Sequence, residues 1–263
     1  MNEGCQKSMK LRILGCSGGV SAGLHSTSLL VDDDILIDAG SGVGNLTLDE
    51  MSKIKHIFIT HSHLDHVTFL PLLIDTIFDR VKEPVLIHGQ EKTLQALQAY
   101  IFNWVVWPDF AELPRPETPV LSYSAIEPGS TWTNNGRTVE MIPVEHIVPT
   151  VGYRVESKAG GSFAFSGDTS TNDSLWNALN AHDKLDLLIV ESAFSNRNLV
   201  LSKLAKHYCP ELLAEDIKKL KHKTKIYITH RKPGEEETIL KECLELMPDL
   251  DITGLEGGEV FTL

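Results

Sequence analysis

The chain has 263 residues, 42% of them hydrophobic, and is long enough to bury a sizeable core. Acidic residues outnumber basic ones 36 to 24, for a net charge of −12. This balance argues against a protein that grips long nucleic acid, because such a protein needs a basic face to displace counterions. No apolar run approaches the roughly 18 residues of a membrane span, and residues 1–10 lack the apolar segment of a secretory signal.

We therefore expect a cytoplasmic protein without a membrane partner. The cysteines agree with that expectation, because they are far apart and form no Cys-x-x-Cys pair: Cys5, Cys16, Cys209 and Cys243. They predict free thiols in a reducing compartment, and neither a disulfide framework nor a thiolate metal site.

Three short strands are predicted at the start of the chain, over residues 10–15, 28–31 and 35–37, with glycine-rich turns between them. The turn at residues 15–19 reads GCSGG. It lacks the Lys-Ser/Thr pair of a P-loop and the full dinucleotide-binding spacing, so we interpret it as a plain turn.

The next predicted strand, residues 55–60, leads directly into the most informative feature of the chain. His61, His63, Asp65 and His66 follow it within six residues. Three imidazoles and a carboxylate are costly to bury together unless they surround a cation. Imidazole and carboxylate are the ligands that zinc and similar metals prefer. The cluster lies where the strand ends, which is where open α/β sheets place their sites.

The remaining elements are predicted from apolar spacing and from turn residues. A helix is expected at residues 91–102 and a loop at residues 108–119, which contain four prolines. Later come helices at residues 170–181, at residues 199–222 with a break near Pro210, and around residues 239–247, before a final strand at residues 259–263.

Three later strands also end in residues of metal-ligand type. His146 follows a strand-like stretch, and Asp168 follows an apolar run and a glycine turn. His230 follows residues 225–229, which nearly repeat the strand before His61. One such histidine is commonplace, but four strand ends of this kind in one chain predict a shared metal site.

This order of a His-x-His-x-Asp-His cluster followed by His, Asp and His resembles the metallo-β-lactamase superfamily over essentially the whole chain. The resemblance implies an α/β fold, a four-layer αββα sandwich, in a single domain over residues 1–263. It also implies two divalent metal ions, with Zn²⁺ as the first choice and Mn²⁺ or Fe²⁺ as alternatives. The implied ligands are His61, His63 and His146 for one ion, Asp65, His66 and His230 for the other, and Asp168 as the bridge. Asp38 is similar to a family residue that orients the ligand loop, although an ordinary turn residue is equally expected there.

Five separated segments narrow the resemblance to the class II cyclic-nucleotide phosphodiesterases: residues 66–75, 100–110, 190–194, 205–214 and 228–233. It implies hydrolysis of 3′,5′-cyclic AMP or cyclic GMP to the 5′-monophosphate by a hydroxide that the dinuclear metal site activates. The aromatic stretch at residues 100–110 is either a lid that stacks on a purine or an inserted loop in which Trp104 and Trp107 pack onto the core or a dimer partner. Phe69 and Arg231 depart from the family pattern near the expected cleft.

His207 and Glu191 are similar to the pair that assists the leaving group in tRNA 3′-processing nucleases. The resemblance therefore implies Asp65, His207 and Glu191 as catalytic residues, with a small cyclic nucleotide as the partner and no long nucleic acid. The alternatives are a tRNA 3′-processing endonuclease, another hydrolase of this fold, or a metal-binding sensor without turnover. A sensor would be expected to have lost a ligand, and none is missing. A homodimer is compatible with the sequence.

Overall fold

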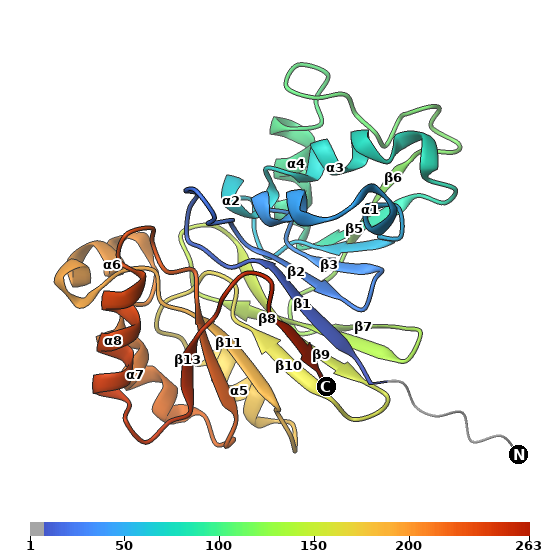
Figure 1. Cartoon of the computed structure of the whole chain (residues 1–263). Helices are drawn as coiled ribbons and strands as arrows, with labels where there is room; N and C mark the ends of the chain where they lie inside the picture. The colour runs from blue at the N-terminus through green and yellow to red at the C-terminus, as the bar shows by residue number, and fades with distance from the viewer. Residues whose placement is uncertain (1–7) are drawn as a thin grey trace, which may run out of the picture.

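Two seven-stranded β-sheets pack face to face, with helices on the outer face of each (Figure 1). The computed structural model describes residues 8–263. The first sheet contains, in order, β14 (Val260–Thr262), β1 (Lys10–Gly15), β2 (Ser28–Val31), β3 (Ile35–Ile37), β4 (His56–Phe58), β5 (Val85–Gly89) and β6 (Leu121–Ala125). The second contains β13 (Ile252–Gly254), β12 (Lys225–Thr229), β11 (Leu187–Glu191), β10 (Ser162–Phe165), β9 (Thr150–Ser157), β8 (Arg137–Val144) and β7 (Thr131–Asn134).

Eight α-helices of the described residues form the two outer layers, and four 3₁₀ turns join them to the strands. The first sheet is covered by α1 (Leu48–Met51), α2 (Leu64–Val67), α3 (Leu70–Thr76) and α4 (Glu91–Tyr100). The second is covered by α5 (Ser174–Asn180), α6 (Leu199–Ala205), α7 (Pro210–Asp216) and α8 (Glu236–Leu246). The 3₁₀ turns are Ser41–Asn45, Phe78–Arg80, Asn196–Asn198 and Ile217–Lys219. This arrangement confirms the predicted four-layer αββα sandwich.

Apolar side chains fill the three spaces between the four layers. One cluster lies under α1–α4, one between the sheets and one under α5–α8. Tyr153 shows how the middle layer is kept free of unpaired polar groups, because its ring is buried there and its hydroxyl donates to the Ile59 carbonyl at 2.7 Å. Both sheets are mixed, with parallel pairing from β3 to β6 and from β10 to β13.

Most predicted elements are present, and the larger differences lie at helix ends. The helix predicted to begin at residue 170 begins at Ser174, after a turn in which Asn172 Oδ1 accepts a hydrogen bond from Leu175 N. The predicted break near Pro210 is confirmed: α6 ends at a left-handed Lys206, and Pro210 starts α7. The helix predicted to reach residue 222 ends earlier, in a 3₁₀ turn that closes at Lys219.

The aromatic stretch at residues 100–110 divides into a packed part and an exposed tip. Phe102 and Phe110 are buried in the first apolar cluster, and Trp107 packs against it. Trp104 is 57% exposed. Packing onto the core is therefore confirmed for Trp107 and is wrong for Trp104, while a dimer contact at Trp104 and the role of the tip as a lid stay predictions.

None of the helices within residues 8–263 has the length and apolar character needed to cross a membrane. Cys16, Cys209 and Cys243 are unpaired thiols, as predicted, and Cys5 lies outside the described residues. Burial raises the pKa of Cys16 and of Cys243 to about 12 in each case, so these thiols stay protonated at neutral pH.

Asp216, at the end of α7, is a buried carboxylate that joins α7 to α5. It accepts a hydrogen bond from Trp176 Nε1 at 2.8 Å and another from the Tyr208 hydroxyl. Its second oxygen lies 2.6 Å from Lys219 Nζ. The substitution Asp216→Ala leaves two buried donors without a partner, which costs about 1–3 kcal/mol each. We expect the free energy of unfolding, measured in urea, to fall by at least that amount.

The pH dependence of this effect has a definite sign. Burial alone would raise the pKa of Asp216. Hydrogen bonds from Lys219, Tyr208 and Trp176 together lower it by more than burial raises it, so the folded-state pKa lies below the ordinary value. The stabilisation is therefore complete above the ordinary Asp pKa and is lost as pH falls through the folded-state pKa. Asp173→Ala is the control, because this exposed carboxylate also pairs with Lys219. Equal losses of stability in the two variants would contradict the prediction.

Candidate metal centre

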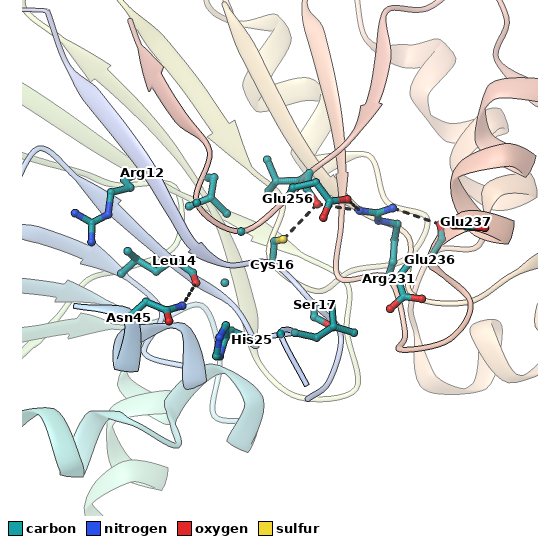
Figure 2. A pocket seen from close by; sticks show the side chains of 17 residues that line it. Arg12, Leu14, Cys16, Ser17, His25, Asn45, Arg231, Glu236, Glu237 and Glu256 are labelled. Carbon is teal, nitrogen blue, oxygen red and sulfur yellow. Dashed lines mark hydrogen bonds and ion pairs between the residues drawn. The ribbon is translucent and has the colours of Figure 1, made fainter. Parts of the chain in front are cut away.

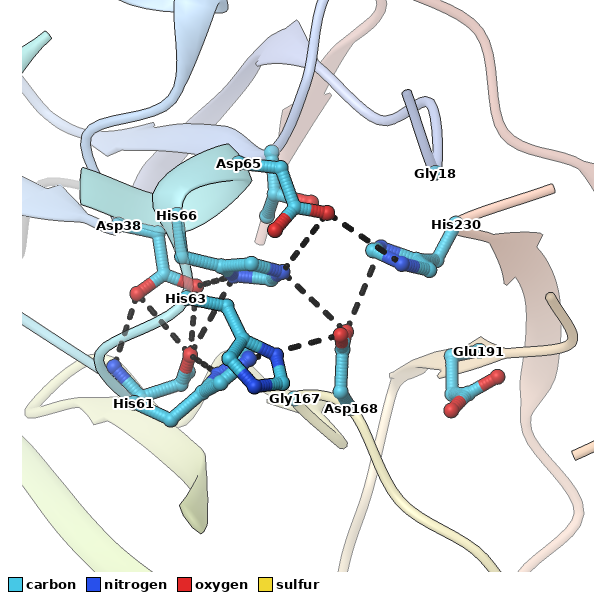
Figure 3. Close-up of polar contacts among 12 residues, drawn as sticks. Gly18, Asp38, His61, His63, Asp65, His66, Gly167, Asp168, Glu191 and His230 are labelled. Atoms are coloured by element: carbon cyan, nitrogen blue, oxygen red, sulfur yellow. Dashed lines mark hydrogen bonds and ion pairs between the residues drawn. The ribbon is translucent and has the colours of Figure 1, made fainter. Parts of the chain in front are cut away.

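The carboxyl ends of strands from both sheets bring together the seven side chains predicted as metal ligands. Most of them are drawn in Figure 3, on the segments that leave β4, β10 and β12. They fall into two groups that share one carboxylate: His61, His63, His146 and Asp168, and Asp65, His66, Asp168 and His230. Within each group the ligand-type atoms all lie within 4.8 Å of one another.

Asp168 lies between the two groups and directs one oxygen toward each. Its Oδ2 is 3.6 Å from His61 Nε2. Its Oδ1 is 3.3 Å from His66 Nε2 and 3.3 Å from His230 Nδ1. On the far side of the second group, Asp65 Oδ2 is 3.7 Å from His230 Nε2. A carboxylate in this position is suited to bridge two cations.

Several buried polar atoms of this cluster have no hydrogen-bond partner, and this is the test of whether cations fit. They are His61 Nε2, His66 Nε2, both ring nitrogens of His230 and Asp168 Oδ1. Buried polar atoms in folded proteins are normally paired. In a tetrahedral zinc site with bonds of about 2.0–2.1 Å, neighbouring ligand atoms lie roughly 3.3 Å apart. The separations around Asp168 are close to that value, so these residues fit divalent cations.

The outer nitrogens of two histidines are held by buried neighbours. Asp38 Oδ2 accepts a hydrogen bond from His66 Nδ1 at 2.7 Å, and Asp38 Oδ1 accepts one from Thr60 N at 2.8 Å. The Thr60 hydroxyl lies 2.9 Å from His61 Nδ1. Partners of this kind fix the tautomer and the ring orientation of metal-binding histidines. The role that the sequence suggested for Asp38 is therefore supported by its contacts.

The loop after α6 supplies the equivalent partner for His146. His146 Nδ1 donates to the Lys206 carbonyl at 2.9 Å. Lys206 has a φ of 53°, and two residues of the centre share this left-handed conformation, Asp38 at 57° and His230 at 59°. Such a backbone is uncommon for residues other than glycine and persists only where its surroundings impose it, often at functional sites.

Burial sets the protonation of most of the cluster. It lowers the pKa of four histidines: His61, His63, His146 and His230. The value is about 4 for His146 and about 3 for His230. These rings are therefore neutral at physiological pH, which is the form that binds metal. Burial opposes the ionisation of Asp168, but His230 and its neighbours lower its pKa well below the usual range.

His66 is the exception among the five histidines of the two groups. Burial lowers its pKa, but the carboxylates of Asp168 and Asp38 raise it well above the ordinary value. Two buried carboxylates thus favour a positive charge at this ring. A metal ion would supply that charge in place of the proton.

His207 and Glu191 lie beside the cluster as a hydrogen-bonded pair. His207 Nδ1 is 2.7 Å from Glu191 Oε1. Glu191 is fully buried and also accepts hydrogen bonds from Thr169 N at 2.9 Å and Ala193 N at 3.0 Å. The His207 ring stacks on His230, with centroids 5.4 Å apart. This arrangement fixes the ring through Nδ1 and leaves Nε2 free at the edge of the cluster.

The pair also forms a third group of metal-ligand type together with Asp168. One ligand-type atom each of Asp168, Glu191 and His207 lies within 4.8 Å of the others. Burial lowers the pKa of His207, but Glu191 raises it by more, so the ring holds a proton more readily than an isolated histidine. The residues predicted as a proton donor and its support are therefore next to the cluster.

The Beta-lactamase superfamily domain matches residues 33–230, well over half of the chain. The chain belongs to the metallo-β-lactamase superfamily. A probable 3′,5′-cyclic-nucleotide phosphodiesterase from Yersinia pestis is 27% identical over 249 residues, which cover 79% of this chain and 71% of that protein. A ribonuclease Z from Staphylococcus saprophyticus is 29% identical over 161 residues, which cover 57% of this chain and 50% of that protein.

Among solved structures, unliganded yeast PDE1 has the same fold. Its TM-score is 0.83 at 18% identity, and the match covers 98% of this chain and 100% of that chain. The predicted superfamily and fold are confirmed, and the comparisons support a hydrolase of the metallo-β-lactamase fold.

The two residues that depart from the family pattern lie outside the ligand cluster. Arg231 Nη2 donates to the Leu255 carbonyl at 2.9 Å and pairs with Glu256 at 2.8 Å (Figure 2). These residues line a cavity of about 660 Å³ whose lining includes none of the seven candidate ligands. Phe69 packs on Gly44 and the first apolar cluster. Arg231 follows the candidate ligand His230 in sequence, but its guanidinium is directed into this separate cavity.

Three supporting residues were not found from the sequence. The sequence gives a weak indication of Thr60, since an Ile-Thr-His sequence occurs at both His61 and His230. It gives no indication of the Lys206 carbonyl, because every residue has a backbone carbonyl. Thr169 follows Asp168 in sequence, and its hydroxyl accepts a hydrogen bond from Glu145 N at 3.1 Å, which ties the segment of His146 to that of Asp168.

We expect Asp38→Asn to weaken metal binding by roughly 10- to 100-fold, the usual effect of losing a partner that orients a ligand. The amide cannot both accept from Thr60 N and offer a carboxylate oxygen to His66 Nδ1. A chelator competition on the purified variant measures the affinity. Asp32→Asn is the control, because Asp32 has a similar left-handed backbone, with φ of 52°, in the turn after β2. The same loss of affinity in both variants would show that the effect comes from the loss of any carboxylate and not from the contact with His66.

Proposed function

We propose that the protein is a metal-dependent phosphodiesterase that hydrolyses 3′,5′-cyclic nucleotides, cyclic AMP or cyclic GMP, to 5′-monophosphates. The observation that carries the proposal is the pair of ligand groups sharing Asp168, with His207 and Glu191 beside them. The substrate class is supported by the relatives from Yersinia pestis and Aliivibrio fischeri. Both are named for this activity, and the chain covers 71% and 73% of their lengths. The net charge of −12 suits a small anion drawn to one local site better than a long polyanion.

The proposal includes two divalent ions, with zinc as the first choice because imidazole and carboxylate are its common ligands, and manganese or iron(II) as alternatives. The proposed ligands are His61, His63 and His146 for one ion, Asp65, His66 and His230 for the other, and Asp168 for both. When bound, two such ions supply a hydroxide nucleophile at neutral pH and neutralise the charge that a phosphodiester gains during hydrolysis.

The side chains around this position have separate tasks in the proposed reaction. Asp65 keeps 30% of its side chain exposed and has one oxygen outside its contacts with His66 and His230, so it is placed to accept a hydrogen bond from the incoming water. His207 donates a proton from Nε2 to the departing 3′-oxygen, while Glu191 holds its Nδ1. Protonation matters because an alkoxide is a poor leaving group. A cytoplasmic location, a homodimer and a single domain stay predictions from the sequence.

A tRNA 3′-processing endonuclease is the second candidate, because ribonuclease Z proteins are also among the relatives. The chain spans half the length of the one from Staphylococcus saprophyticus in that match. The excess of acidic residues counts against it, because tRNA binding relies on basic contacts to phosphates.

One substrate panel separates the two candidates. Protein reconstituted with metal is assayed with cyclic AMP, cyclic GMP, bis(p-nitrophenyl) phosphate and precursor tRNA. We expect one or both cyclic nucleotides to be hydrolysed to the 5′-monophosphate, while the tRNA stays intact. Cleavage of tRNA without any turnover of cyclic nucleotides would reverse the order of the candidates.

A further inference from the structure

Lys232 is a half-buried lysine beside the candidate site whose charge has no carboxylate partner. It lies two residues after His230, and it forms no ion pair within residues 8–263. Its neighbour Arg231 is paired with Glu256 at 2.8 Å. Removing an ammonium group from water is costly unless another group compensates its charge. An anionic ligand is therefore the natural partner for Lys232.

The backbone around Lys232 holds its ammonium at the edge of the metal-ligand cluster. Lys232 N donates to the Ala193 carbonyl at 3.1 Å, and Nζ donates to the Gly18 carbonyl at 2.6 Å. Gly18 lies beside His230 in Figure 3. The two are so close that a Cβ added to Gly18 would be 2.2 Å from the His230 carbonyl oxygen. An ammonium has three N–H donors. The Gly18 carbonyl accepts from one of them, which leaves two donors for a ligand.

The same ammonium lies on the side of the cluster where His207 is found. Lys232 Nζ is 5.9 Å from the centroid of the Phe194 ring, and that ring meets His207 edge to face with centroids 5.6 Å apart. Its hydrogen-bond partner Gly18 lies against His230, one of the proposed metal ligands. The ammonium is thus close to a proposed metal ligand and to the proposed proton donor.

We propose that Lys232 binds the phosphoryl group of the substrate and is a specificity-determining residue for phosphodiesters and their monophosphate products. This inference rests on the proposed function. Lysine binds phosphate as a point charge, and its attraction grows with the charge of the anion. A diester carries one negative charge and a monophosphate at neutral pH nearly two. Lys232 therefore contributes more to holding the product and the charged transition state than to holding the diester.

The test compares Lys232→Gln and Lys232→Arg with the unaltered protein, each reconstituted with metal. Calorimetry measures the affinity for inorganic phosphate, and kinetics give kcat and KM for bis(p-nitrophenyl) phosphate. We expect Lys232→Gln to weaken phosphate binding by roughly tenfold or more, as for a charge-assisted hydrogen bond. The KM for the diester should rise by a smaller factor, the metal content should stay unchanged, and Lys232→Arg should restore most of the phosphate affinity.

Lys241→Gln is the charge-matched control, because this lysine is 75% exposed on α8 and its loss changes the net charge equally. Unchanged phosphate affinity in Lys232→Gln, or equal losses in Lys232→Gln and Lys241→Gln, would overturn the proposal. A loss that Lys232→Arg fails to restore would also overturn it, since it would indicate a packing role. Phosphate and the dye carry no nucleoside. Failure of the protein to hydrolyse cyclic nucleotides would therefore refute the proposed function and leave this test intact.

Discussion

Asp168→Ala is expected to retain at most one tightly held metal ion per chain and to lose turnover by several orders of magnitude. Asp168 is the one residue shared by the two ligand groups, with an oxygen 3.6 Å from His61 Nε2 and another 3.3 Å from His66 Nε2. Without this carboxylate, neutral imidazoles would face two cations with little negative charge between them. Elemental analysis of the purified variant gives the number of ions, and the diester dye gives the turnover.

Asp65→Ala is the matched comparison, because Asp65 belongs to the second group alone. It should keep the ion held by His61, His63 and His146, and it should lose affinity at the other position only. Two tightly held ions in Asp168→Ala would refute the bridging role. Complete metal loss from both variants would indicate that the two groups do not act as separate positions.

His207→Ala is expected to keep both ions and still to reduce the turnover of cyclic nucleotides by roughly 10²–10⁴-fold, the usual contribution of general acid catalysis. Its Nδ1 is held by Glu191 at 2.7 Å, which leaves Nε2 for the proposed protonation of the leaving oxygen. The loss should be much smaller for bis(p-nitrophenyl) phosphate, because nitrophenolate departs without a proton. Parallel kinetics on the two substrates measure the difference.

His182→Ala tests whether any loss of a histidine–carboxylate pair has this effect, since His182 Nε2 lies 2.7 Å from Glu140 and outside both ligand groups. It should leave both activities unchanged. Equal losses of the two activities in His207→Ala would indicate a packing defect. Loss of one ion would instead assign His207 to metal binding, for which its atoms are close enough to Asp168.

The fold was predictable where sequence pattern and structure depend on the same local contacts. The strands Lys10–Gly15, Ser28–Val31 and Ile35–Ile37 have the predicted bounds, because apolar runs between glycine-rich turns have few alternatives. The predicted start of α5 was wrong, since Asn172 forms a turn before the helix and donates from its backbone N to Asp216 at 3.0 Å. That contact spans 44 residues and leaves no local pattern. Short helices such as α2, which has four residues, also carry too little periodicity to be predicted.

The candidate site was predictable to the extent that its residues stand at strand ends. Carboxyl ends of strands meet at one edge of the sandwich, so the residues that follow β4 and β12 come together although they are far apart in sequence. The spacing does not reveal which contacts support them. The Lys206 carbonyl that holds His146, and the loop that brings the Lys232 ammonium to Gly18, depend on backbone conformation and on long-range packing.

Titration of the metal-free protein with zinc tests the proposed dinuclear site most directly. Turnover of bis(p-nitrophenyl) phosphate is followed as zinc is added in known amounts, at a protein concentration well above the dissociation constants. The account predicts that activity rises until two ions per chain are bound, because both ligand groups must be filled. Full activity at one ion per chain, with no further change on adding a second, would contradict it.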